Sequence, residues 1–265
     1  MNNTIVKTCL AFLSVICVLT ACFTACSAEQ TSRENSLEAA LDAYHTSGCG
    51  KLPYGISVSD LFVADGVLFG RNTLLRYPEW IEWEHYAIPD FVEFINDSAF
   101  AENKHLRSVT IPDSCILIGE GSFAECPAFE EVLLGEDSRL LIIETGAFRD
   151  CRQLKSFAFP PMLSVIGSEA FSYTGLEELV FPTNLLYIGE NAFAHDHIRS
   201  LDFGNNTSME YISPEAFETQ YLSEIKLPID SGAYEVFYRM NENSSDDRII
   251  WVFYDEYYDD FENEE

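Results

Sequence analysis

Residues 106–123 read LRSVTIPDSCILIGEGSF, and the chain repeats the pattern of this stretch six times between Tyr86 and Phe217. Each copy ends in a small residue followed by a phenylalanine, and an isoleucine stands five positions before that phenylalanine. The phenylalanines are spaced 23, 25, 23, 22 and 24 residues apart. The anchor pairs are Ile95 and Phe100, Ile118 and Phe123, Ile143 and Phe148, Ile166 and Phe171, Ile188 and Phe193, and Ile212 and Phe217. Six copies in a fixed register indicate a repeat solenoid.

The first half of each copy predicts a short strand. In the fourth copy, Phe157 and Phe159 share one face because strand side chains alternate, and Pro160 then ends the strand. A single coil buries these groups poorly, whereas coils stacked about 4.8 Å apart bury them as continuous columns. Each buried Phe or Ile contributes roughly 1.5–3 kcal/mol. We therefore expect a β-rich solenoid of about six to seven coils of 22–25 residues.

These residues also carry a family resemblance. The string Ile-Pro-x-x-h-x-x-Ile-Gly-x-x-Ala-Phe, where h is apolar, is followed by a cysteine at Cys126 and Cys151. It resembles the BspA-like leucine-rich repeats of bacterial surface proteins. The stretch Asp65–Phe69, DGVLF, resembles the hairpin that opens many such arrays. The resemblance covers residues 60–228 and implies an extracytoplasmic binding or adhesion role, without naming a ligand.

The segments around the repeats predict caps. A helix with Leu37, Ala40, Leu41 and Tyr44 on one face is expected to cover the first coil, and a hairpin around Asp65-Gly66 to cap the open edge. A helix followed by a strand is expected to close the other end. The predicted boundaries are 1–21 signal peptide, 22–35 flexible tether, 36–85 N-terminal cap, 86–228 solenoid, 229–254 C-terminal cap and 255–265 solvated acidic tail.

The N-terminus has the composition of a secretory signal. Lys7 supplies the positive start, and the apolar run Cys9–Leu19 is too short for a membrane span. Leu19-Thr-Ala-Cys22 looks like a lipobox, in which cleavage precedes Cys22 and its sulfur receives diacylglycerol. Cys26 is a competing site, and an ordinary signal cleaved further on is the alternative. We therefore expect a cell-surface lipoprotein that meets the membrane only through its lipid anchor.

Charge and motifs exclude several classes of function. The formal net charge of −29 argues against nucleic acid, whose binders cluster Lys and Arg. No phosphate loop, paired Cys-x-x-Cys, zinc-protease or hydrolase motif is present, so no enzyme and no cofactor are expected. His195 and His197 form the only close histidine pair, and neighbouring coils offer them Tyr173 and Thr219. We expect no metal there.

Three cysteines fall within the repeats. Cys115 fills a slot that holds Val, Leu or Met in other copies, where it acts as a small hydrophobic residue. Cys126 and Cys151 fill the corner slot held by Asn103, Thr174, Asp196 and Gln220 elsewhere. Adjacent coils would bring these two Cα atoms to about 5 Å, within disulfide range. The slot explains both residues without a bridge, so no pairing is forced.

The residues between the inward strand positions form outward columns, and these predict the binding face. One column has an apolar centre and the other alternates Ser and Glu. The candidate binding residues are Glu131, Leu133, Ala158, Glu178, Val180, Asp202 and Glu224. We expect a protein-binding or adhesion module whose unknown partner is basic or amide-rich; an ordinary solvated sheet face is the alternative.

A carbohydrate-binding module is the second hypothesis. It would use exposed aromatic residues of the caps, such as Trp80 and Trp83 or the tyrosine-rich C-terminus. We expect the tryptophans to pack under the cap, and an exposed pair would instead favour a glycan or peptide platform.

Overall fold

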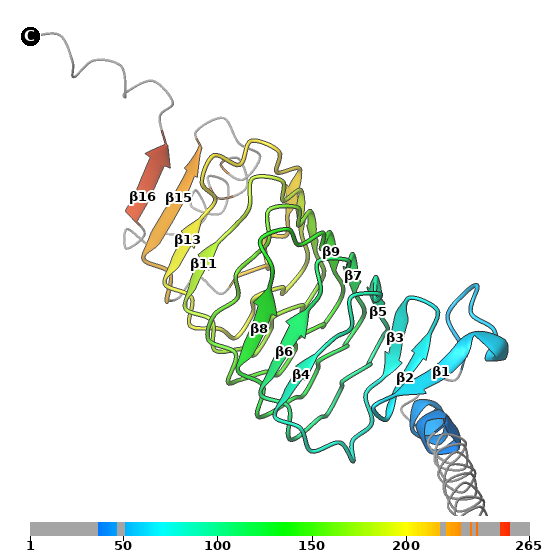
Figure 1. Ribbon diagram of the computed structural model, residues 1–265. Coiled ribbons are helices and arrows are strands. Elements are labelled where there is room, and N and C mark those ends of the chain that lie inside the picture. Colours follow the sequence, from blue (N-terminus) through cyan, green and yellow to red (C-terminus); the bar gives the residue numbers. More distant parts are fainter. Residues whose placement is uncertain are drawn as a thin grey trace, which may run out of the picture.

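The computed structural model describes residues 37–46, 51–217, 221–228, 234, 237 and 250–254. These residues form an elongated stack of coils with parallel strands along two walls (Figure 1). The first wall is a nine-stranded sheet, which we call the isoleucine sheet. Its strands, in spatial order, are β1 (Leu61–Ala64), β2 (Val67–Gly70), β3 (Thr73–Arg76), β5 (Phe94–Ile95), β7 (Leu117–Ile118), β9 (Ile142–Ile143), β10 (Val165–Ile166), β12 (Tyr187–Ile188) and β14 (Tyr211–Ile212).

The second wall consists of the strands that lead each repeat. It is divided into a three-stranded and a four-stranded sheet. The first contains β4 (His85–Ala87), β6 (Ser108–Ile111) and β8 (Glu131–Leu134), and the second contains β11 (Glu178–Val180), β13 (Ser200–Asp202), β15 (Glu224–Pro228) and β16 (Ile250–Tyr254). We call the outward surface of β4 to β15 the leading-strand face. A short 3₁₀ helix, η1 (Val58–Asp60), precedes β1.

The repeat anchors lie in the core between the walls. All twelve are at most 5% exposed, and the isoleucines pair in register from one coil to the next. The phenylalanine rings stack face to face, with centroids 4.6–5.3 Å apart and interplanar angles of 1–14°. The predicted solenoid with internal Ile and Phe columns is therefore confirmed.

The turn that inserts each phenylalanine is also hydrogen-bonded between coils. The backbone N–H of Phe100 donates to the carbonyl of Ser122, and the same bond recurs up to Phe193 and Ala216 at 2.7–2.9 Å. The turn needs two left-handed residues in each of five copies: Ser98 and Glu102, Gly121 and Glu125, Gly146 and Asp150, Glu169 and Tyr173, and Asn191 and His195. Left-handed backbone is unfavourable for most side chains. The repeated ladder bonds offset that cost.

One predicted strand is not formed. Residues 154–159 make no ladder with β8 or β11, and this gap divides the leading wall into its two sheets (Figure 1). Both inward positions of this copy are phenylalanines, whose rings pack against Phe148 and Phe171 with interplanar angles of 62–81°. The neighbouring leading strands have the smaller pairs Val132 with Leu134 and Leu179 with Phe181. We attribute the lost pairing to the larger volume of the two rings.

The N-terminal cap differs from the expectation in two respects. The hairpin around Asp65-Gly66 is confirmed, with φ of 52° and 82° at those residues, but a third strand, β3, continues it and pairs with β5. The helix over 37–46 packs on the outer face of this hairpin, with Tyr44 and Ala40 buried against Leu68 and Leu75, instead of covering the first coil. The hairpin therefore caps the isoleucine sheet, and β4 remains an edge strand.

At the other end, β16 pairs in parallel with β15, and Phe237 packs on Phe203 and Phe217. The predicted signal peptide, Cys22, the tether and the acidic tail lie outside the described residues. Within the described part of the chain, no helix has the length and apolar character to cross a membrane.

Candidate functional site

The leading-strand face presents the predicted binding residues in register. Glu178 pairs laterally with Ser200 and then Glu224, and Val180 pairs with Asp202 and then Lys226. In the other sheet, Glu131 and Leu133 lie on β8 beside Ser108 and Thr110. Ala158 is exposed on the unpaired segment between β8 and β11. The fold thus brings all seven candidates to one face, on both sides of the gap.

The side chains of this face differ in their exposure to solvent and in whether they already form hydrogen bonds or ion pairs. Val180 is 66% exposed and Leu133 is 43% exposed, so the apolar centre is open to solvent. Asp202 accepts a hydrogen bond from the Gly204 N–H at 2.8 Å, and Glu224 forms an ion pair with Lys226 at 3.5 Å. For Glu131 and Glu178 the described residues provide no ion-pair partner. The carboxylates of Glu131 and Glu178 are therefore available to interact with a partner.

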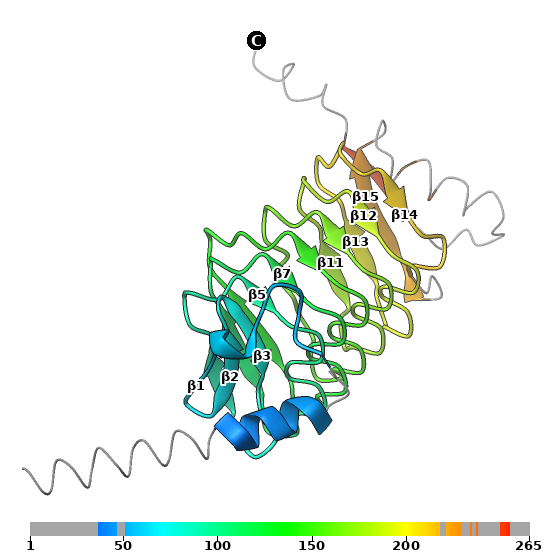
Figure 2. The same cartoon turned by 90° about the vertical axis from the view of Figure 1, so that its right-hand side faces the viewer.

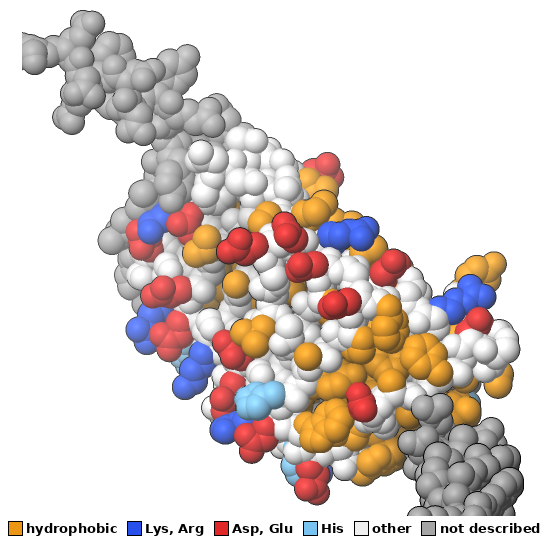
Figure 3. Space-filling view, in the orientation of Figure 1, with side chains coloured by type: hydrophobic (Ala, Val, Ile, Leu, Met, Phe, Trp, Pro, Cys, Tyr) orange, Lys and Arg blue, Asp and Glu red, His pale blue; other side chains and the backbone are white. Residues whose placement is uncertain are grey.

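A column of alternating charge borders this face. Glu84, Arg107, Glu130, Lys155, Glu177 and Arg199 each precede the leading segment of their copy. Arg107 bridges to Glu130 at 2.8 Å and to Glu84 at 4.0 Å, and Arg199 bridges to Glu177 at 3.5 Å. The alternation is visible along one rim of the face in Figure 3. Each exposed pair contributes little stability, but opposite charges favour the in-register stacking of coils.

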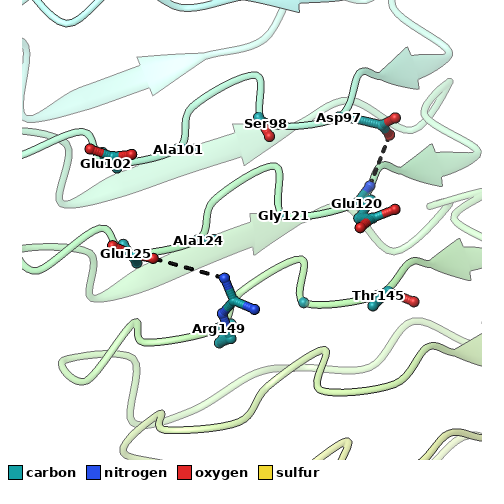
Figure 4. A pocket seen from close by; sticks show the side chains of 11 residues that line it. Asp97, Ser98, Ala101, Glu102, Glu120, Gly121, Ala124, Glu125, Thr145 and Arg149 are labelled. Carbon is teal, nitrogen blue, oxygen red and sulfur yellow. Dashed lines mark hydrogen bonds and ion pairs between the residues drawn. The ribbon is translucent and has the colours of Figure 1, made fainter. Parts of the chain in front are cut away.

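A separate groove of about 490 Å³ runs along the turn edge of the first three copies (Figure 4). Its charged groups make contacts between coils. Asp97 accepts a hydrogen bond from the Glu120 N–H at 3.0 Å, and Arg149 lies 3.8 Å from Glu125 and 3.4 Å from Glu169. The groove is open and carries both signs of charge. These contacts connect the turns of successive coils.

His195, His197, Cys126 and Cys151 each pack against groups of neighbouring coils. His195 stacks on Tyr173 at 4.1 Å, and His197 lies 4.5 Å from the Tyr221 ring. Across the described residues, no three His, Cys, Asp or Glu side chains gather into a set that could hold a metal ion. Cys126 and Cys151 are free and buried, and their thiols approach the carbonyls of Phe100 and Phe123 at 3.2 and 3.0 Å. Burial raises the pKa of the Cys151 thiol, and neighbouring Cys126 raises it further.

The expectation that Trp80 and Trp83 pack under the cap is wrong. Trp80 is 55% exposed and Trp83 is 45% exposed, with Trp83 stacked on Tyr86 at 6.1 Å. The two tryptophans lie in the segment between β3 and β4. This segment is outside the repeat register, so it has no position that the repeat buries. Apolar side chains gather at this β1–β4 end of the molecule in Figure 3. The exposed aromatic residues there also include Phe62 and Phe91.

Reasoning from the sequence overlooked a second surface. The residue before each anchor isoleucine points out of the isoleucine sheet because neighbouring strand residues alternate. In all six copies that residue is apolar, from Phe94 to Tyr211. The signal is present in the repeat register, one position before each anchor isoleucine.

Three comparisons with known proteins bear on this fold. A family model for the BspA type leucine rich repeat region matches residues 79–199 and 136–244, with six copies. The structure of the pneumococcal vaccine antigen PcpA is similar at 18% identity and a TM-score of 0.57, over 74% of this chain and 48% of that protein. No match was found among curated proteins.

Two further solved structures are similar over shorter stretches. A leucine-rich cell surface protein of Faecalibacterium prausnitzii A2-165 shares 27% identity over 68% of this chain and 42% of its own, with a TM-score of 0.48. A leucine-rich repeat protein of Bacteroides ovatus ATCC 8483 shares 24% identity over 67% and 48%, with a TM-score of 0.46. The chain spans less than half the length of each of these three proteins.

Proposed function

Because this chain belongs to the family of BspA-type leucine-rich-repeat proteins, we propose that it is a surface-tethered module that binds a partner protein. The binding surface in this proposal is the leading-strand face. The observation that carries it is an open apolar centre, Leu133 and Val180, flanked by Glu131 and Glu178, whose carboxylates have no ion-pair partner among the described residues. Exposed apolar side chains within a charged rim are the usual composition of a protein-binding patch.

The chemistry of the face selects the partner. Glu131 and Glu178 attract a basic or amide-rich surface and repel an acidic one, so they act mainly on association rate. Val180 and Leu133 are the side chains that a partner would bury, and buried apolar anchors slow dissociation. The gap at residues 155–159 adds backbone groups without a described ladder partner at the centre of the face. A partner that supplies both apolar contact and hydrogen bonds fits this surface.

The direct test begins with isolation of the partner by affinity capture and continues with measured affinities for variants. Val180→Arg should weaken binding by about tenfold or more, equal to about 1.4 kcal/mol, because it places a charge at the apolar centre. Glu178→Lys should slow association and reduce its salt dependence. Glu136→Lys makes the same charge change at an exposed position outside the face and should bind as wild type. Equal affinities for all three variants would assign binding to another surface.

Exposure of the two tryptophans supports a second candidate, a carbohydrate-binding role for the N-terminal cap. Indole rings that are about half exposed can stack on sugar rings. Trp80→Ala and Trp83→Ala should then abolish retardation by soluble polysaccharides in affinity gel electrophoresis. Tyr54→Ala is the control, because Tyr54 is a fully exposed aromatic residue of the same cap. Migration unaffected by polysaccharide in the wild type would exclude this role for the glycans tried.

A further inference from the structure

The outer face of the isoleucine sheet carries an unbroken apolar column. Its members pair laterally from strand to strand, so their side chains lie next to one another across six coils. They are Phe94, Leu117, Ile142, Val165, Tyr187 and Tyr211. The preceding position is also at least partly exposed and adds Ile116, Leu141 and Leu186. A sheet face open to water ordinarily carries polar residues at such positions.

The side chains of the column are only partly exposed because their lateral neighbours in the sheet cover part of their surface. Each side chain has neighbours about 4.8 Å away on both sides, which cover much of its surface without any partner. The first four members are partly exposed, while Tyr187 and Tyr211 are 39% and 45% exposed and stack at 5.1 Å. The leading-strand column is different, since it includes Thr110, Asp202 and Lys226. A uniformly apolar column therefore indicates a surface that another element covers.

The chain itself shows what packs on this face. At the β1–β3 end, the helix over 37–46 covers the outward side chains Leu68 and Leu75, which are fully buried by Tyr44 and its neighbours. Thr73 of β3 pairs with Phe94 of β5, so the covered and uncovered parts are continuous. Figure 2 shows the helix at this end of the molecule. From β5 to β14 the outward side chains are at least partly exposed, so the described residues leave this part of the face open.

Charge narrows the identity of the missing element. No Lys or Arg occurs within two residues of any anchor isoleucine. Carboxylates instead flank the apolar column along its length, at Glu93, Asp97, Glu120, Glu144, Glu190 and Glu210. Burial raises the pKa of Glu144, and the neighbouring carboxylates of Asp97 and Glu120 add to that rise. A second copy of a chain with net charge −29, or an anionic lipid surface, would be repelled.

We propose that this face binds an amphipathic, cationic α-helix of a partner protein, with its apolar side on the column and Lys or Arg at its flanks. The five strand intervals from β5 to β14 span about 24 Å, which a helix of about 16 residues covers. The site is distinct from the leading-strand face. Failure of either proposal therefore leaves the other in place.

The experiment uses two synthetic helices of about 16 residues with a leucine face, one flanked by lysines and the other by glutamates. Fluorescence anisotropy with the purified protein should show saturable binding of the lysine peptide, weakened by salt, and no binding of the glutamate peptide. The double variant Ile142→Ser/Tyr187→Ser should weaken binding by about tenfold or more. Val58→Ser, at an exposed apolar position of the N-terminal cap outside both faces, should bind as wild type.

Hydrogen-exchange mass spectrometry locates the peptide independently of any variant, with protection expected at β5 to β14. Thermal melts establish that the variants remain folded, and the single substitutions replace the double one if it unfolds. Equal binding of both peptides, or protection confined to the leading strands, would overturn the proposal. Association with phosphatidylcholine vesicles that the same substitutions abolish would assign the face to lipid instead. Self-association abolished by them would assign it to a second copy.

Discussion

Each phenylalanine of the column contacts rings in neighbouring coils, so the loss of one ring affects at least three coils. Phe171 stacks on Phe148 and Phe193 at 5.1 and 5.3 Å and receives the edges of Phe157 and Phe159. Phe171→Ala should lower the free energy of unfolding by about 3–5 kcal/mol, because it removes buried ring surface and leaves a cavity. Urea denaturation followed by circular dichroism measures this change.

Glu178→Ala is the matched control for Phe171→Ala, since Glu178 is exposed on the next leading strand. Its denaturation midpoint should remain within experimental error of the wild type. If the two variants unfold at the same urea concentration, the phenylalanine column does not carry the stability assigned to it.

Cys115 links stability to alkaline pH. Burial raises the pKa of its thiol from 9.0 to about 12, and a backbone hydrogen bond with Leu117 offsets part of that rise. Above pH 9 the unfolded thiol ionises while the native thiol stays protonated. The free energy of unfolding should therefore fall as pH rises from about 9 toward 12, by at most about 1.4 kcal/mol per pH unit for this group.

Comparison with Cys115→Val isolates the contribution of this thiol, because Val92 fills the same slot in the first copy. The fall in urea midpoint between pH 8.5 and pH 10.5 should be smaller in the variant than in the wild type. Tyr77 and Tyr86, whose pKa values burial also raises, contribute equally to both proteins. Superimposable pH profiles would show that the Cys115 thiol is not held protonated.

At the scale of elements, the gap in the leading wall should be measurable as local instability. The backbone amides from Lys155 to Phe159 have no ladder partner among the described residues, whereas those of β11 are paired with β13. Native-state hydrogen exchange should therefore be faster across 155–159 than across 178–180. Slow, equal exchange in both segments would mean that the wall is continuous in solution.

Some structural elements could be predicted from the sequence and others could not. The Ile and Phe columns were predictable because each anchor recurs at a fixed spacing and every copy buries it. The gap was not, because it depends on how the Phe157 and Phe159 rings fit between their neighbours. The exposure of Trp80 and Trp83 was also missed, since their segment has no repeat register. The apolar column before the isoleucines was present in the sequence and required only the alternation rule.

At the scale of the whole molecule, two walls of opposite character share one core. The leading-strand face mixes charge with a small apolar centre, whereas the isoleucine sheet is apolar from Phe94 to Tyr211. A solenoid permits this division because each coil contributes one residue to every column, so a face is altered by changing single positions repeatedly. A net charge of −29 favours solubility and repels acidic surfaces.

The prediction for the whole molecule concerns where the solenoid is held. We expect Cys22 to become the lipidated N-terminus, because Leu19-Thr-Ala-Cys22 follows an apolar core of the length that signal peptides have. Mass spectrometry of the membrane fraction should then find a chain that begins at residue 22 and carries a diacylglyceryl group. One acyl-bearing anchor and a polar tether leave both walls accessible to partners, and the strongly acidic surface adds no attraction to anionic lipid.

Two substitutions separate the possible anchors. Cys22→Ser should release the protein from the membrane fraction, whereas Cys26→Ser should leave it there, because the residue at the first position of the second site, Phe23, suits lipidation less well than Leu19. The reverse result would move the anchor to Cys26 without changing its chemistry. A soluble, unmodified chain that begins after Ala25 would contradict lipid anchoring altogether. In that case the two proposed binding faces would belong to a secreted protein. Tethering would then not raise the local concentration of the module at the cell surface.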